Sequence, residues 1–136
     1  MAVNFGVNYL AVVVAAVVAL VIGFIWYSPR VFGTRWMAYL GTTQPQLGNP
    51  GPTGMLVGVV ASLLNAWVLA LLALNLGGKS VTDGVLLGVL AWLGFMATIT
   101  AAQISFEKKS WGLWVLNNAH NLLVQVIMAA IVTAWR

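Results

Sequence analysis

The sequence contains very little charge. Only 6% of its 136 residues are Asp, Glu, Lys or Arg, whereas 62% are hydrophobic. Ordinary soluble domains carry roughly one quarter charged residues, so this chain has too few of them to cover a water-exposed surface. We therefore expect an integral membrane protein.

Cysteine is absent, and the chain has one His and two acidic residues. Disulfides, thiolate metal sites and cysteine nucleophiles are therefore excluded. A metal or haem site at His120 would need further ligands, and both carboxylates, Asp83 and Glu107, belong to expected helix ends. No acid–base pair, nucleophile–base pair or glycine-rich phosphate loop is present, so we expect no enzyme, no metal and no cofactor.

The six basic residues give a net charge of +4 but are scattered at segment ends. This placement is typical of lipid head-group anchors and topology signals, not of a nucleic-acid-binding patch. Four of the six belong to one side of the expected bundle, which favours placing that side in the cytoplasm of a bacterial inner membrane. The margin is small, so insertion in both orientations stays open. The four are Arg30, Arg35, Lys108 and Lys109.

Four apolar stretches are long enough to cross about 30 Å of hydrocarbon at 1.5 Å per residue. The first lacks a basic region before it and is too long for a secretory signal, so we expect a retained span. The chain is predicted to be one transmembrane domain, residues 1–136, with an all-α four-helix fold. The predicted spans are residues 7–27, 54–76, 84–105 and 112–135.

Between the first two spans, Ser28-Pro29 has the pattern of an N-cap followed by proline at the first helical position. Residues 29–40 are therefore predicted to form a short interfacial helix that Gly41 terminates. Residues 42–52 carry three prolines and two glycines and are predicted to be a non-helical loop.

Three side chains of the interfacial segment are predicted to contact lipid, namely Arg30, Arg35 and Trp36. Two isolated glycines, Gly33 and Gly112, are predicted to be sites of close contact. Asp83 precedes the predicted third span and fits an N-cap or first-turn residue.

The predicted spans have faces of small or polar residues, which allow neighbouring helices to approach closely. Four thin spans of this kind leave little interior volume inside one bundle. We therefore expect a homo-oligomer, with a dimer favoured. The small faces include Ala11, Ala15 and Ala19 in the first span, Gly54, Gly58 and Ser62 in the second, and Gly84, Gly88 and Ala91 in the third.

The fourth span carries the main polar feature of the sequence. At 100° per residue, Asn117, Asn121 and Gln125 fall within about 80° of one another, with Asn118 beside them. Such a stripe should not face lipid. It either forms hydrogen bonds between helices or lines a cavity or conduction path, where amides replace part of a solute's hydration shell.

Three further residues belong to the candidate site in either interpretation. Asn8 and Asn65 are candidate partners of the stripe from the first and second spans. His120 lies roughly 60° from the direction of Asn117, and a packing role is favoured over a ligand or proton-relay role.

Residues 23–41 (GFIWYSPRVFGTRWMAYLG) and residues 106–135 resemble the small bacterial integral membrane family catalogued as domain of unknown function 1761. The most specific part is Trp26-Tyr27-Ser28-Pro29, followed by Phe32-Gly33 and Trp36-Met37. The resemblance covers nearly the whole chain and implies a four-span bacterial membrane protein. It implies no activity and no functional residues.

The leading functional hypothesis is a homo-oligomeric transporter or channel-like protein for a small solute, with a path lined by the amides of the fourth span. The alternative is a structural or accessory membrane protein that binds lipid or a partner protein through residues 28–40. Membrane lipids are expected partners in both cases. The alternative is favoured if the interfacial segment is essential while the amide stripe tolerates apolar replacement.

Overall fold

The computed structural model describes residues 1–136 and is helical, with no strand. Four of its helical stretches are long and apolar enough to cross a membrane: Tyr9–Trp26, Gly51–Asn75, Val81–Phe106 and Trp111–Ala134. The prediction of an all-α membrane bundle is confirmed. The elements in chain order are α1 Tyr9–Trp26, α2 Gly33–Leu40, α3 Gln44–Leu47, α4 Gly51–Asn75, α5 Val81–Trp92, the π-helical segment η1 Leu93–Ala97, α6 Thr98–Phe106 and α7 Trp111–Ala134.

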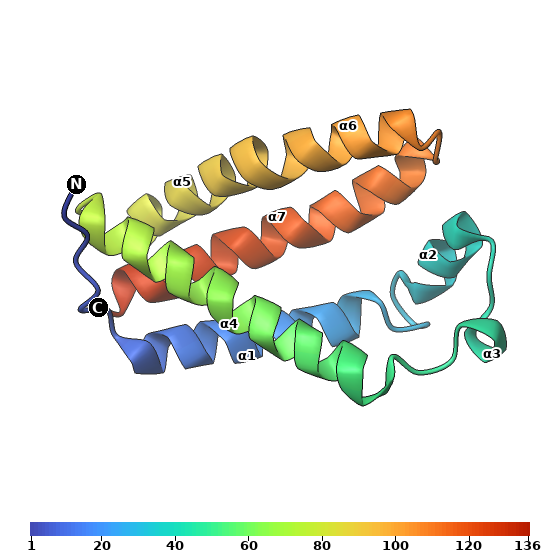
Figure 1. The fold of residues 1–136 in the computed structure, drawn as a ribbon, viewed down its shortest axis with the longest axis horizontal. Coiled ribbons are helices and arrows are strands. Elements are labelled where there is room, and N and C mark those ends of the chain that lie inside the picture. The colour runs from blue at the N-terminus through green and yellow to red at the C-terminus, as the bar shows by residue number, and fades with distance from the viewer.

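Helix α7 is the central element, because it packs against α1, α4 and α5, and α1 also packs against α4. Figure 1 shows that both termini and the α4–α5 turn lie at one end of the bundle, here called the terminal end. The short helices α2 and α3 and the α6–α7 turn lie at the opposite end, here called the α2–α3 end. Helices α1 and α4 form one closely packed pair and α5 and α7 another, and α4 and α6 diverge toward the α2–α3 end (Figure 1).

The hydrophobic core fills the half of the bundle near the terminal end. Small side chains dominate it, so the helices approach closely and leave few gaps. Met128 and Ala129 of α7 are completely buried at its centre. The core comprises Val12, Ala15, Ala16, Ala19, Ala66, Leu69, Ala70, Ala91, Val124, Met128, Ala129 and Val132.

Two glycines set the closest helix contact, between α5 and α7. A Cβ atom added to Gly84 would lie 2.6 Å from the Cα of Ala130, and one added to Gly88 would lie 2.6 Å from the Cα of Val126. Real Cβ atoms essentially never approach a backbone this closely. The glycines predicted to form a small face therefore allow the two backbones to touch.

Helix α2 begins at Gly33, so the prediction of a helix that begins at residue 29 is wrong at its start. Ser28 serves the helix before it: its Oγ donates a 2.7 Å hydrogen bond to the carbonyl of Ile25. Its own carbonyl accepts from the backbone N–H groups of Val31 and Gly33 at 3.0 and 2.9 Å, which closes a tight turn. The Ser-Pro pair therefore ends one helix instead of starting the next.

The two isolated glycines are both close contacts, as predicted. A Cβ atom at Gly33 would collide with the carbonyl oxygen of Tyr27, and one at Gly112 would collide with the phenol of Tyr39. The second contact docks α2 onto α7. Gly41 ends α2 with a φ of 68°, a conformation that favours glycine.

The loop over residues 42–52 is not wholly non-helical. Helix α3 forms in it because Thr43 and Gln46 make a capping box around Pro45. Helix α4 then starts at Gly51, earlier than the predicted residue 54, since Pro52 fits its first turn.

The third span also begins earlier than the predicted residue 84. Ser80 is the N-cap, and its Oγ accepts a 3.1 Å hydrogen bond from the N–H of Asp83. The Asp83 carboxylate accepts in return from the N–H groups of Ser80 and Lys79, at 3.0 and 2.9 Å. Asp83 is thus a first-turn residue of a capping box.

Candidate functional site

A cavity of about 1140 Å³ occupies the half of the bundle near the α2–α3 end. Residues of α1 and α7 form its floor, α4 and α6 form its walls, and α2, α3 and the loop after α3 lie at its mouth. The bundle therefore holds more open space than the sequence suggested, because α6 stands away from the other helices.

Four of the predicted site residues line this cavity together: Asn117, Asn118, His120 and Asn121. They lie in the first half of α7, where the small-residue core has ended. The Asn117 Oδ1 accepts a 2.8 Å hydrogen bond from the hydroxyl of Tyr27, which ties α7 to the end of α1. The Asn121 Oδ1 lies 3.2 Å from the Nδ1 of His120.

Asn118 is the centre of a buried hydrogen-bond network and is only 2% exposed. Its Oδ1 accepts from the indole N–H of Trp92 at 3.2 Å, and its Nδ2 donates to the Oγ1 of Thr100 at 3.1 Å. The Nδ2 also donates to the carbonyl of Trp114, whose indole N–H donates to Thr100 at 3.1 Å. This amide thus joins α7 to both parts of the third span.

The π-helical segment η1 separates those two parts. Helix α5 packs closely along α7, whereas α6 approaches the α7 backbone much less. Single π turns inside α-helices often occur at functional sites, because the extra residue per turn redirects the helix that follows. Here the π segment marks the point along the third span where close contact with α7 ends, and Trp92, Trp114 and the cavity lie beside it or beyond it.

Gln125 lies outside the cavity, although the stripe predicted it there. It is 5% exposed and its Nε2 donates to the Sδ of Met96 in η1 at 3.0 Å. Its Oε1 is buried and has no hydrogen-bond partner. Gln125 therefore connects α7 to the π segment and does not extend the open amide surface.

His120 packs between aromatic side chains of α1. Its ring centroid lies 5.1 Å from that of Tyr27 and 6.0 Å from that of Trp26. An amide oxygen can only accept, so the contact with Asn121 places the ring proton on Nδ1 and leaves Nε2 as an acceptor. The Nε2 is buried and has no partner.

Asn8 and Asn65 do not join the α7 stripe. Asn8 is the N-cap of α1, where its Oδ1 accepts from the N–H groups of Leu10 and Ala11. It therefore lies near the terminal end, far from the cavity. Asn65 is half-buried on α4, is not among the cavity residues and makes no side-chain hydrogen bond. On α4 the cavity is lined instead by Ser62, one turn earlier.

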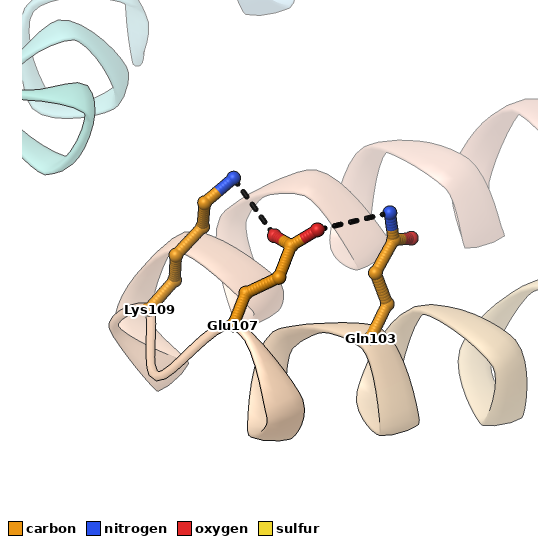
Figure 2. Close-up of polar contacts among 3 residues, drawn as sticks. All are labelled: Gln103, Glu107 and Lys109. Atoms are coloured by element: carbon orange, nitrogen blue, oxygen red, sulfur yellow. Dashed lines mark hydrogen bonds and ion pairs between the residues drawn. The ribbon is translucent and has the colours of Figure 1, made fainter.

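The cavity mouth carries the only ion pair of the chain. Lys109 Nζ lies 2.8 Å from the Glu107 carboxylate, which also accepts a 3.3 Å hydrogen bond from Gln103 (Figure 2). The hydrogen bond from Lys109, aided by its charge, lowers the pKa of the Glu107 carboxyl. The pair is exposed, so the mouth is polar but carries no net charge from these two residues.

The predicted lipid-contacting residues fall into two groups. Arg30 and Arg35 are exposed around α2, as a head-group contact requires, and form no ion pair. Trp36 is half-buried, stacks edge-on against Tyr27 at 5.3 Å and lines the cavity.

Sequence reasoning missed Tyr27 and Thr100, which bond directly to the α7 amides, and Trp114, whose indole N–H donates to Thr100. Tyr27 is 90 residues from Asn117 in the sequence. Its polar tip at a span end was the available signal, because buried tyrosine and tryptophan usually find a hydrogen-bond partner. The chain has no group of three or more His, Asp or Glu side chains placed to hold a metal ion.

A family model described as "Protein of unknown function (DUF1761)" matches residues 10–133 of the chain. This match confirms the resemblance seen in the sequence. Neither the curated proteins nor the solved structures include a significant match to the chain.

Proposed function

The chain belongs to the DUF1761 family of unknown function, and we propose that it is a membrane transport protein for a small neutral solute. The solute occupies the cavity and contacts the amides of Asn117 and Asn121. The observation that supports this proposal is the cavity of about 1140 Å³, whose floor combines several amides in the middle of otherwise apolar spans. Amides in hydrocarbon are retained where they bond to other helices or to a solute.

The interior of the cavity favours a neutral solute over an ion. Its polar lining there consists of amides, hydroxyls, aromatic N–H and O–H groups and one imidazole. The charged lining residues, Glu107 and Lys109, are paired with each other at the mouth. Burying an unpaired ion in such surroundings costs several kcal/mol or more, so uncharged molecules are preferred.

We propose alternating access instead of an open channel, because the bundle is closely packed at the terminal end. Met128 and Ala129 of α7 are completely buried on the terminal side of the amides. A solute reaching Asn121 from the mouth therefore cannot continue without a rearrangement of the helices. We propose that such a rearrangement occurs where α6 separates from α7, beyond η1.

We further propose a location in the bacterial inner membrane and a homo-oligomeric state with a dimer favoured. The basic residues at the α2–α3 end, Arg30, Arg35, Lys108 and Lys109, favour a cytoplasmic position for the cavity mouth. Native mass spectrometry of the protein released from nanodiscs tests the oligomeric state. Release of monomers alone would contradict the dimer.

Solute flux in proteoliposomes tests the proposal. Swelling after an osmotic step with glycerol or urea should be faster with the wild type than in empty vesicles. Asn121→Leu should slow it several-fold, because one hydrogen bond is lost from the path. Asn65→Leu is the matched control, since it replaces a half-buried amide outside the cavity. Equal swelling rates with the wild type and both variants would remove the support for transport.

A second candidate, a lipid- or partner-binding accessory protein, draws support from the surface around α2. Val31, Tyr39 and Leu40 are between 41% and 45% exposed there, beside the exposed Arg30 and Arg35. This combination suits a helix at a lipid surface. Replacing Arg30 and Arg35 by Gln should leave vesicle swelling unchanged if the transport proposal is correct. It should weaken binding to lipid or to the partner protein if the accessory role is correct.

A further inference from the structure

The solute of the cavity can be assigned to a chemical class from the polarity of its two sides. We infer that it is an amphiphile that bears carbonyl oxygens but no charged group, and that it enters from the bilayer between α4 and α6. The inference rests on the proposed function in taking this cavity as the solute site, and it adds the class of molecule and its route.

The amide groups that stay free on the cavity floor are hydrogen-bond donors. Asn117 uses its oxygen to accept from Tyr27, and the oxygen of Asn121 lies against the His120 Nδ1. The Nδ2 groups of both asparagines have no partner within the chain, and both residues line the cavity. Each amide therefore offers two N–H donors to an occupant, and the complementary group is an acceptor such as a carbonyl oxygen.

The α4 side of the cavity, opposite the amides, carries almost only small side chains. Along α4 it is formed by Gly54, Gly58, Ala61 and Ser62, with Met55 as the one long side chain. A Cβ atom added to Gly58 would meet no atom within 4 Å. An apolar chain or ring can therefore lie directly against the α4 backbone while its oxygens face α7.

The size of the cavity exceeds what a small hydrophilic solute would fill. Drug-sized ligands occupy pockets of about 300–1,000 Å³, and this open cavity has a volume of about 1140 Å³. Glycerol or urea would fill only a small part of this volume and would leave most of the apolar α4 wall uncovered. An amphiphile covers both the amides and that wall.

The route follows from the arrangement of the cavity walls. Helices α4 and α6 both line the cavity, yet the two are not packed against each other, and they diverge toward the α2–α3 end (Figure 1). Ala61 of α4 and Gln103 of α6, one from each wall, are exposed. In a membrane this side faces hydrocarbon, so a molecule dissolved in the bilayer reaches the amides without crossing water.

Native mass spectrometry from nanodiscs tests the inference. The nanodiscs consist of phosphatidylcholine with a small fraction of either a short-chain ubiquinone or dioleoylglycerol, two carriers of carbonyl oxygens. The wild type should retain one of these in preference to phosphatidylcholine, and the arm that is retained identifies the source. Replacing both Asn117 and Asn121 by Leu should lower the retained fraction about tenfold, because two donors are lost.

A second pair of variants separates loss of binding from loss of folding. Gly58→Phe should exclude the amphiphile by filling the cavity from the α4 side. Gly94→Phe is the matched control, since a Cβ atom there also meets no atom within 4 Å, but Gly94 is exposed and does not line the cavity. Retention lost in Gly58→Phe and kept in Gly94→Phe supports the inference.

Two results overturn it. One is retention of phosphatidylcholine alone by the wild type, and the other is equal retention of the quinone or diacylglycerol by all variants. If either occurs while Asn121→Leu still slows glycerol swelling, the transport proposal stands with a water-soluble solute. If the amphiphile is retained specifically while swelling ignores Asn121, the class of ligand stands and solute transport fails.

Discussion

The two halves of the bundle use the same helices in opposite ways. Toward the terminal end, alanines and glycines bring α1, α4, α5 and α7 into close contact, and residues such as Met128 are fully buried. Toward the α2–α3 end, the same α7 carries amides, α6 has moved away, and a cavity takes the place of the core. Close packing in one half holds the helices together while the other half stays open.

The change occurs where the third span contains its π turn, Leu93–Ala97. Before it, Gly84 and Gly88 touch the α7 backbone. After it, contact with α7 is made by polar bridges through Thr100, which accepts from the indole N–H of Trp114 and the amide of Asn118. A span that was straight and glycine-lined throughout would have no room for the amide cavity.

The largest loss of stability is expected from adding a methyl group in the closely packed half near the terminal end. Gly88→Ala would place a Cβ atom 2.6 Å from the Val126 Cα and 2.7 Å from the Gln125 carbonyl, so α5 and α7 must separate. Overpacking of this kind costs about 1–3 kcal/mol. Equilibrium unfolding in mixed detergent micelles measures the loss.

Gly94→Ala is the control for that substitution, because it adds the same methyl group where no atom lies within 4 Å. It should leave stability unchanged or raise it by up to about 1 kcal/mol, since alanine favours the helix. Equal destabilisation by the two variants would show that close packing does not distinguish the two regions.

The second prediction compares two neighbouring amides. Asn118→Leu leaves the indole N–H of Trp92 without its partner and removes the bond to Thr100, so unfolding free energy should fall by about 1–2 kcal/mol. Asn117→Leu removes one bond, to Tyr27, on the cavity floor and should cost less than about 1 kcal/mol. A larger loss of unfolding free energy for Asn117→Leu than for Asn118→Leu would contradict this prediction and would indicate that the cavity floor stabilises the fold.

The smallest expected effect is the pH dependence of stability that comes from the ion pair at the cavity mouth. Because Lys109 lowers the pKa of Glu107, the pair stabilises the folded state at pH values above the ordinary pKa of Glu. That contribution is lost as the pH falls from the ordinary pKa through the lowered one. Both groups are exposed, so the effect is small and is screened by salt. Glu107→Gln should flatten the acid side of the stability profile, and an unchanged slope would contradict the assignment.

The span architecture could be predicted from sequence because hydropathy and length are local properties. Residues 54–76 and 112–135 lie within a few residues of α4 and α7, and the donor and acceptor roles of Asp83 follow from its position in a first turn. The clustering of Asn117, Asn118 and Asn121 also follows, since helical periodicity places them together.

The cavity itself could not be predicted from the same rules. It depends on the divergence of α6, and the sequence over Leu93–Ala97 has no proline or other marker that announces a π turn. The bond between Tyr27 and Asn117 depends on tertiary packing across most of the chain. The Ser28-Pro29 pair led to a wrong helix start, because a serine hydroxyl can donate to a preceding carbonyl as well as accept from a following N–H.

Thiol labelling tests most directly the claim that one half is open and the other closed. The chain has no cysteine, so Asn117→Cys and Met128→Cys each carry a single thiol on α7. In proteoliposomes treated with a membrane-impermeant maleimide from either side, the thiol at position 117 should react from the α2–α3 side. The thiol at position 128 should not react from any side until the protein is unfolded. Equal reaction at both positions, or no reaction at position 117, would contradict the account.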